Sequence, residues 1–170
     1  AGNQQRVNDT WDDGSFRLVQ HLHNSPAGTA PQMRDSTRYA NHGTCNGAMT
    51  AANQVPGKID GSLSFDGTND AVNAGNQASL NFGAGEDFTI EAWIKCSDNT
   101  SYPAVGKYCD ISVPGYWLAV LGGRFDLRVS DAGGSYFGVS TSATYNDDAW
   151  HHVVGTADRD GRATLYVDGQ

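Results

Sequence analysis

The eight residues Phe88–Lys95, which read F-T-I-E-A-W-I-K, decide the fold class of this chain. Apolar and polar side chains alternate along the segment, and successive side chains of a β-strand point to opposite faces of its sheet. The alternation therefore predicts a strand with one face toward a core and the other toward solvent. We expect Phe88, Ile90, Ala92 and Ile94 on the inner face, and Thr89, Glu91, Trp93 and Lys95 on the outer face.

Shorter segments of the same kind lie on both sides of this strand. We expect further strands at Phe16–His23, Ser62–Phe65, Ala71–Val72, Tyr116–Leu121, Arg124–Val129, Tyr136–Ser140, Trp150–Ala157 and Ala163–Val167. Gly122-Gly123 suits a two-residue hairpin turn, and Asp66-Gly67 indicates a second hairpin. The 21 glycines of the chain also favour tight turns over helices. The pattern predicts an all-β, antiparallel two-sheet sandwich with almost no helix.

Length and charge limit the classes of protein and partner. A chain of 170 residues suits one domain, and its 19 acidic and 11 basic residues give a net charge of −8. An acidic domain repels phosphate backbones, which argues against a nucleic-acid partner. No apolar run approaches the roughly 20 residues of a membrane span. Because Ala1–Asp13 is polar, we expect any targeting segment to lie outside this sequence.

The C-terminal residues predict an incomplete sheet. Thr164–Val167 reads as a strand and Asp168-Gly169 as a hairpin turn, but no returning strand follows. Natural proteins usually cover such an exposed edge. We therefore expect the sandwich to lack its closing C-terminal strands, which are deleted, disordered or donated by a neighbouring chain.

Five motifs, in order, resemble the conserved blocks of bacterial laminin-G-like domains of the concanavalin A-like superfamily. They are D-S-T-R-Y-A-N-H-G-T (Asp35–Thr44), G-S-L-S-F-D-G-T-N-D-A-V (Gly61–Val72), Phe88–Lys95, W-H-H-V-V-G-T (Trp150–Thr156) and L-Y-V-D-G (Leu165–Gly169). The chain departs from the family at Ala71, where tyrosine is usual, and at Cys45, where an aliphatic residue is usual. The family's closing I-D-E-V-R-I-Y segment is not present in this sequence.

The resemblance implies a concanavalin A-like jelly roll over residues 14–170, incomplete at its C-terminus. Residues 1–13 would then be a linker or the end of a preceding extracellular module. In the family the closing segment pairs with the first strand, which here is Phe16–His23. We accordingly expect this strand to pair with residues outside the sequence or to remain exposed.

The loop Asp35–Thr44 is the candidate metal site. Asp35 offers a carboxylate, Asn41 an amide and Thr44 a hydroxyl, and calcium prefers such oxygen ligands. The resemblance also implies a structural calcium near this loop, with a further ligand from the closing segment. The alternative is a turn held by Asx hydrogen bonds alone.

The outer face of Phe88–Lys95 is the candidate ligand site. Trp93 offers a flat ring on which a sugar can stack, and Glu91 and Lys95 beside it offer polar groups for sugar hydroxyls. The alternative is that these aromatics belong to the core. A catalytic role is not expected, because a retaining glycosidase needs two carboxylates about 5 Å apart on one face. Glu86 and Asp87 do not meet this requirement, since Glu86 is at an odd offset from Glu91 and Asp87 falls in the preceding turn.

The spacing of Cys96 and Cys109 suits a disulfide between adjacent strands, the alternative being that all three cysteines are buried free thiols. Together these features predict a non-catalytic, calcium-stabilised recognition or adhesion module, secreted or on the cell surface, that binds a carbohydrate or a cell-surface protein. One alternative is an assembly element completed by a strand from a neighbouring chain. A second is a truncated glycoside hydrolase.

Overall fold

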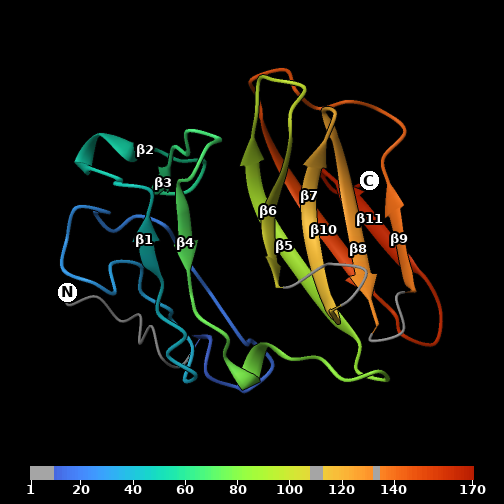
Figure 1. Ribbon diagram of the computed structural model, residues 1–170. Helices are drawn as coiled ribbons and strands as arrows, with labels where there is room; N and C mark the ends of the chain where they lie inside the picture. Colours follow the sequence, from blue (N-terminus) through green and yellow to red (C-terminus); the bar gives the residue numbers. More distant parts are fainter. Residues whose placement is uncertain (1–9, 108–112, 132–134) are drawn as a thin grey trace. The chain divides into compact units, whose positions relative to one another are not determined.

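The computed structural model describes residues 10–107, 113–131 and 135–170 (Figure 1). The chain forms two compact units, Ala1–Leu80 and Asn81–Gln170, and the structure describes each unit by itself. Helix is scarce among the described residues: η1 (Ala51–Asn53) and η2 (Ala78–Leu80) are 3₁₀ helices of three residues each. No helix in these residues is both long and apolar enough to cross a membrane.

The second unit is a sandwich of two antiparallel sheets (Figure 1). One sheet has the order β11-β10-β5 and the other the order β6-β7-β8-β9. The strands are β5 (Phe88–Lys95), β6 (Ser101–Lys107), β7 (Gly115–Leu121), β8 (Arg124–Ser130), β9 (Tyr136–Ser140), β10 (Trp150–Ala157) and β11 (Ala163–Val167). This arrangement confirms the predicted all-β sandwich.

The core of the second unit lies between its two sheets. Leu118, Leu127 and Val153 have no exposed surface, and Phe88 and Ile90 of β5 are buried with them. Ala92 and Ile94 pack against this core, whereas the four alternate residues of β5 are exposed. The predicted faces of β5 are therefore confirmed. Burial of apolar surface stabilises such a core by about 25 cal/mol per Å².

The hairpin β7–β8 turns at Gly122 and Gly123, as the sequence predicts. Both have positive φ, 57° and 78°, which suits a type I′ turn and is open to glycine at little cost. The turn pairs Leu121 with Arg124 and thereby sets the register of the whole hairpin. All seven residues of β7 are in this way matched one by one to β8.

The first unit contains two sheets of two short strands each. β1 (Thr44–Asn46) pairs with β4 (Ala71–Asn73), and β2 (Gln54–Pro56) pairs with β3 (Gly61–Leu63). The predicted hairpin through Asp66-Gly67 is therefore wrong, because its two strands pair elsewhere. Asp66 instead lies in a loop, where its Oδ1 accepts hydrogen bonds at 2.8 to 3.2 Å from the backbone amides of Thr68, Asn69 and Asp70.

The predicted strand Phe16–His23 is also wrong. Its contacts with a sheet-like geometry are a single bridge between Gln20 and Asp35 and a hydrogen bond from the Ser36 amide to the Val19 carbonyl at 3.1 Å. The segment therefore contacts residues of its own unit. Its pairing with residues outside the sequence, which the family resemblance implies, stays a prediction.

Strand β6 was not predicted because its sequence, S-Y-P-A-V-G-K, contains proline and glycine. Proline lacks the amide proton that a central strand needs, and it is tolerated at sheet edges and at bulges. Here β6 lies at the end of its sheet, and its register with β7 shifts between Pro103 and Val105.

The predicted turn at Asp168-Gly169 forms after β11. The amide and carbonyl of Val167 exchange hydrogen bonds with those of Gln170 at 3.0 and 3.1 Å, and both turn residues have positive φ. Within the described residues, no strand pairs with the outer edge of β11. The strand-donating neighbour therefore stays a prediction.

Candidate functional site

Asp35 is buried and its carboxylate accepts four hydrogen bonds within the first unit. Oδ1 accepts from the amides of Val19 and Thr37, both at 3.0 Å. Oδ2 accepts from the Thr37 hydroxyl and the Asn41 amide, both at 2.8 Å. These donors satisfy the carboxylate without a cation, so the contacts support the Asx-turn alternative.

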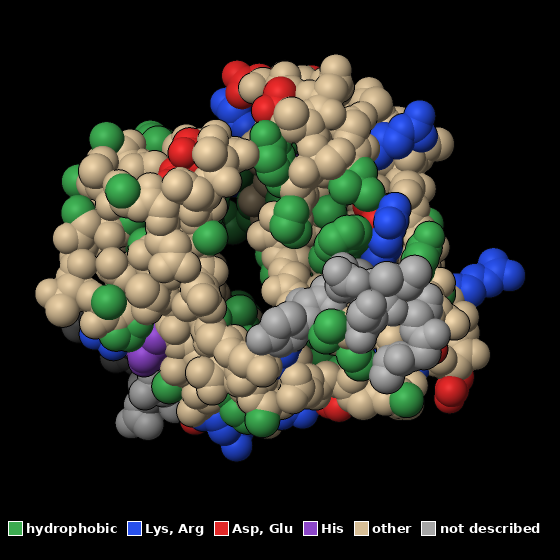
Figure 2. Space-filling model, viewed as in Figure 1, with side chains coloured by type: hydrophobic (Ala, Val, Ile, Leu, Met, Phe, Trp, Pro, Cys, Tyr) green, Lys and Arg blue, Asp and Glu red, His purple; other side chains and the backbone are tan. Residues whose placement is uncertain are grey.

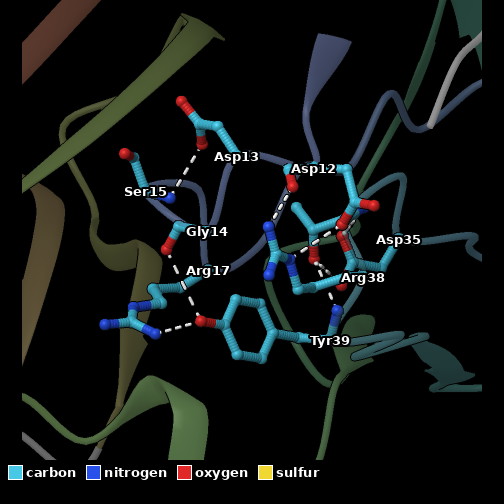
Figure 3. Close-up of polar contacts among 9 residues, drawn as sticks. Asp12, Asp13, Gly14, Ser15, Arg17, Asp35, Arg38 and Tyr39 are labelled. Atoms are coloured by element: carbon cyan, nitrogen blue, oxygen red, sulfur yellow. Dashed lines mark hydrogen bonds and ion pairs between the residues drawn. The ribbon is translucent and has the colours of Figure 1, made fainter. Parts of the chain in front are cut away.

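Side chains of the Asp35 loop also contact the segment 12–17 (Figure 3). Arg38 forms an ion pair with Asp12 at 2.9 Å, and the Tyr39 hydroxyl accepts a hydrogen bond from Arg17 and donates to the Gly14 carbonyl. Residues at the start of the predicted domain are thereby held against the Asp35 loop.

The other two predicted calcium ligands are not gathered around Asp35 by their side chains. The side-chain amide nitrogen of Asn41, Nδ2, donates to the Arg17 carbonyl at 2.8 Å and to the Ser79 hydroxyl at 3.0 Å. Thr44 instead lines an open hollow of about 340 Å³ together with His42, Asn46, Asn73, Ala74, Gly75 and Gln77. Among the described residues, no group of three or more His, Cys, Asp or Glu side chains is placed to hold a metal ion. The calcium site stays a prediction.

Cys96 has a free thiol in this structure, and its Sγ donates to the Tyr145 carbonyl at 3.4 Å. Burial, followed by the charges of Asp98 and Asp147, raises the pKa of this thiol.

Cys109 lies outside the described residues, so its disulfide with Cys96 stays a prediction. If the chain is exported to an oxidising compartment, mass spectrometry without reductant should find the two cysteines cross-linked. Two alkylatable thiols at these positions would contradict the pairing and weaken the extracellular assignment.

Glu91, Trp93 and Lys95 lie on the outer face of β5, where His152 of β10 joins them. We call these four residues the Trp93 face. Trp93 is 36% exposed, and its ring lies 5.1 Å from that of His152, its partner on β10. The Glu91 carboxylate, 62% exposed, lies 3.9 Å from His152 Nε2. Lys95 pairs with Asp148 at 3.1 Å. An indole, an imidazole and two charged groups thus share one solvent-facing surface.

Among the described residues, the strand register places no second acid beside Glu91. Thr89 and Trp93 are its neighbours on the same face of β5, and the register places Val154 and Tyr166 beside it on β10 and β11. The Glu86 carboxylate accepts a hydrogen bond from the Gly83 amide, and Asp87 accepts one from the Arg159 amide. Both of these acids hold loop backbone.

A second polar and aromatic array, which sequence reasoning missed, lies on the outer face of the four-stranded sheet (Figure 2). The Asp126 side chain is 3% exposed and accepts from Trp117 Nε1 at 3.1 Å, Arg128 Nε at 2.8 Å and Ser140 Oγ at 2.6 Å. The Arg128 guanidinium lies 5.5 Å from both the Trp117 ring and the Tyr136 ring. This network holds β7, β8 and β9 together by side chains.

Several solved structures have a fold similar to that of this chain. Solved structures with the same fold include the binding domain of Paraclostridial Mosquitocidal Protein 1, at 20% identity and a TM-score of 0.62, covering 86% of this chain and 38% of that one. The receptor binding domain of botulinum neurotoxin C/D mosaic serotype has 17% identity and a TM-score of 0.57, covering 89% and 37%. The receptor binding domain of botulinum neurotoxin D has 19% identity and a TM-score of 0.54, and the match covers 89% of this chain and 38% of that one.

This chain therefore spans less than two fifths of the length of these structures, and the likeness shows a shared fold. A search of curated proteins found no significant match. The Laminin_G_3 family model, described as concanavalin A-like lectin/glucanases superfamily, matches residues 66–170. Because this match covers more than half of the sequence and the second unit has the expected two-sheet sandwich, the chain belongs to the concanavalin A-like lectin/glucanases superfamily.

Proposed function

We propose that this domain is a non-catalytic recognition module of a secreted or cell-surface protein, and that it binds a carbohydrate, free or carried by a cell-surface protein, through the Trp93 face. The observation that carries the proposal is the exposed indole of Trp93 beside the Glu91 carboxylate and the His152 imidazole. A sugar ring presents apolar C–H groups that pack on an aromatic face. Its hydroxyls need donors and acceptors, which Glu91, His152 and Lys95 supply.

A binding role is favoured over glycoside hydrolysis by the surroundings of Glu91. Hydrolysis by a carboxylate pair requires a second acid within about 5 to 10 Å across the bond. Among the described residues, the outer-face neighbours of Glu91 on β5 and β10 are Thr89, Trp93, His152 and Val154, with Tyr166 on the next strand, and none of them is an acid. The solved structures of similar fold are binding and receptor binding domains, which supports the same class of function.

The alternative of strand addition keeps one supporting observation. Among the described residues the outer edges of β11 and β5 have no paired strand, and an unpaired edge can accept one from another chain. Calcium stabilisation near Asp35 also stays part of the proposal.

A glycan array probed with the wild-type protein tests the proposal. We expect binding to a restricted set of glycans, and we expect Trp93→Ala to weaken it on the order of tenfold, or about 1.4 kcal/mol, because the stacking surface is lost. Tyr136→Ala is the matched control, since Tyr136 is another exposed aromatic, 61% exposed, on the opposite sheet. Equal binding by wild type and Trp93→Ala, or loss of binding on Tyr136→Ala alone, would remove the Trp93 face as the site.

A further inference from the structure

His151 lies on β10 directly behind the Trp93 face. It pairs with Ile94, so its side chain points to the core side of the sheet, whereas His152 points outward. Its side chain is 12% exposed, and its ring lies 4.9 Å from the Tyr145 ring and 6.2 Å from the Phe125 ring. His151 is therefore a titratable group at the margin of an apolar core.

Both ring nitrogens of His151 contact a carboxylate. Nδ1 lies 2.8 Å from Asp168 Oδ2, and Nε2 lies 3.1 Å from Asp147 Oδ1. A neutral imidazole has one N–H donor and one lone pair, while an ionised carboxylate only accepts. The two contacts are hydrogen bonds at the same time only if the ring is the doubly protonated imidazolium.

The charges agree with this geometry. Partial burial by itself would lower the pKa of His151, but the hydrogen bonds and charges of Asp168 and Asp147 together raise it above 6.5. The hydrogen bond from His151, followed by that from the Ala149 amide, lowers the pKa of Asp147. For Asp168 the hydrogen bond from His151 and then the His152 amide do the same.

Each of the two carboxylates is connected to one residue of the Trp93 face, Asp168 to His152 directly and Asp147 to Lys95 through the adjacent Asp148. Asp168 Oδ1 accepts from the His152 amide at 2.9 Å, and the Asp168 amide donates to the His152 carbonyl at 2.9 Å. Asp147 accepts from the Ala149 amide at 3.1 Å and is followed by Asp148, whose carboxylate holds Lys95. Asp148 has a positive φ of 61° and donates its amide to the Cys96 carbonyl. The His151 contacts therefore restrain the segment that positions Lys95 and the backbone that positions His152.

Other titratable groups surround this arrangement. Tyr145 and the Cys96 thiol lie on the core side, and the charge of Asp98, after burial, helps to raise the pKa of that thiol. Glu91, His152 and the Lys95–Asp148 pair lie on the outer side. From β8 the contact is Phe125, which has no charge. His152 is the neighbouring histidine on β10, so an experiment must assign the signals of the two rings separately.

We infer that His151 is a proton-operated clamp that holds the Trp93 face in its binding arrangement. The imidazolium holds Asp147 and Asp168 together. When it loses a proton, the remaining N–H stays on Nδ1 against Asp168, because that contact is the shorter one. The Nε2 lone pair then faces Asp147, which moves away and loosens the grip of Asp148 on Lys95. The effect on ligand affinity rests on the proposed function, whereas the clamp itself does not.

The sign of the pH dependence follows from the pKa directions. Because the His151 pKa is raised, its stabilising contribution is complete below 6.5 and is lost as the pH rises through the raised value. Because the pKa values of Asp147 and Asp168 are lowered, their contributions are complete above 3.8 and are lost in more acidic solution. The clamp is closed in mildly acidic solution and opens on the alkaline side.

Histidine side-chain NMR of the wild-type protein, from about pH 5 to about pH 8, tests the clamp without any ligand. We expect His151 to carry protons on both nitrogens in mild acid, with a midpoint above 6.5. Amide-exchange protection of Ala149 should fall across the same midpoint. Asp147→Asn, a change at an exposed residue, should lower the His151 midpoint. A His151 that is neutral at pH 6, or protection that ignores its titration, would overturn the inference.

Two variants connect the clamp to binding, using the glycan that the array selects for the wild type. The wild-type affinity should fall as the pH rises through the His151 midpoint, and His151→Gln should flatten this profile. His152→Gln should weaken binding at every pH but keep the profile. A clamp seen by NMR without glycan binding would contradict the proposed function alone. Binding with no pH dependence through the His151 midpoint would contradict the inference alone.

Discussion

Replacing Asp126 with alanine is expected to cost about 3 kcal/mol of folding free energy and to lower the melting temperature by about 10 °C. The carboxylate is nearly inaccessible, and three donors on three strands point at it: Trp117 Nε1, Arg128 Nε and Ser140 Oγ. Alanine would remove the shared acceptor of these donors and the ion pair between Asp126 and Arg128. Because Arg128 is partly exposed, water can solvate part of its charge in the variant. The expected cost therefore lies at the lower end of the range for buried ion pairs.

Thermal unfolding followed by circular dichroism measures this change. Asp160→Ala is the matched control, because Asp160 is an exposed acid in the turn before β11, and its loss should cost no more than about 0.5 kcal/mol. If Asp126→Ala melts together with this control, the network does not hold the four-stranded sheet.

Asp35→Ala is expected to have the second large effect, about 3 kcal/mol of local stability, because it removes the acceptor of four hydrogen bonds. The donors are the amides of Val19, Thr37 and Asn41 and the hydroxyl of Thr37. Hydrogen exchange should show loss of protection at these three amides. Asp13→Ala, which removes an exposed acceptor of one hydrogen bond, is the control and should leave the protection unchanged. Retained protection in Asp35→Ala would mean that another group holds the loop.

The same two proteins distinguish the calcium proposal from the Asx turn. If calcium binds at Asp35, EDTA should lower the wild-type melting temperature and added calcium should restore it, with no response in Asp35→Ala. If the hydrogen bonds suffice, as the contacts of the carboxylate suggest, the wild type should ignore both additions while Asp35→Ala remains destabilised.

Local patterns predicted the sandwich because its strands are long enough to show their periodicity. In β5 eight residues alternate without exception, and at Gly122-Gly123 the turn chemistry sets the register by itself. That register already places Trp117 opposite Arg128 and Ala119 opposite Asp126. The pairing could have identified part of the Asp126 network. Ser140 could not be added, because it comes from β9, whose register no two-residue turn determines.

The first unit was harder to predict for a physical reason. Its strands have three residues each, too few for an alternation to be distinguished from chance, and β1 pairs with β4, which lies far along the sequence, so that no local signal reports the pairing. The Asp35 loop was recognised as rich in oxygen atoms. What the sequence did not show is that Val19 approaches the loop from a segment outside any named strand and donates its amide to Asp35. Whether the Asp35 carboxylate has oxygen lone pairs left for a cation therefore depends on tertiary structure.

The measurement that tests the central claim most directly is an NMR titration of the indole N–H groups with the glycan that the array selects. The chain has four tryptophans, and they report on separate places. Trp93 and Trp150 lie on β5 and β10, Trp117 lies on β7, and Trp11 lies in the first unit. We predict that the Trp93 signal shifts in proportion to occupancy, while those of Trp117 and Trp11 stay in place. A shift at Trp117 with an unmoved Trp93 signal would contradict the account.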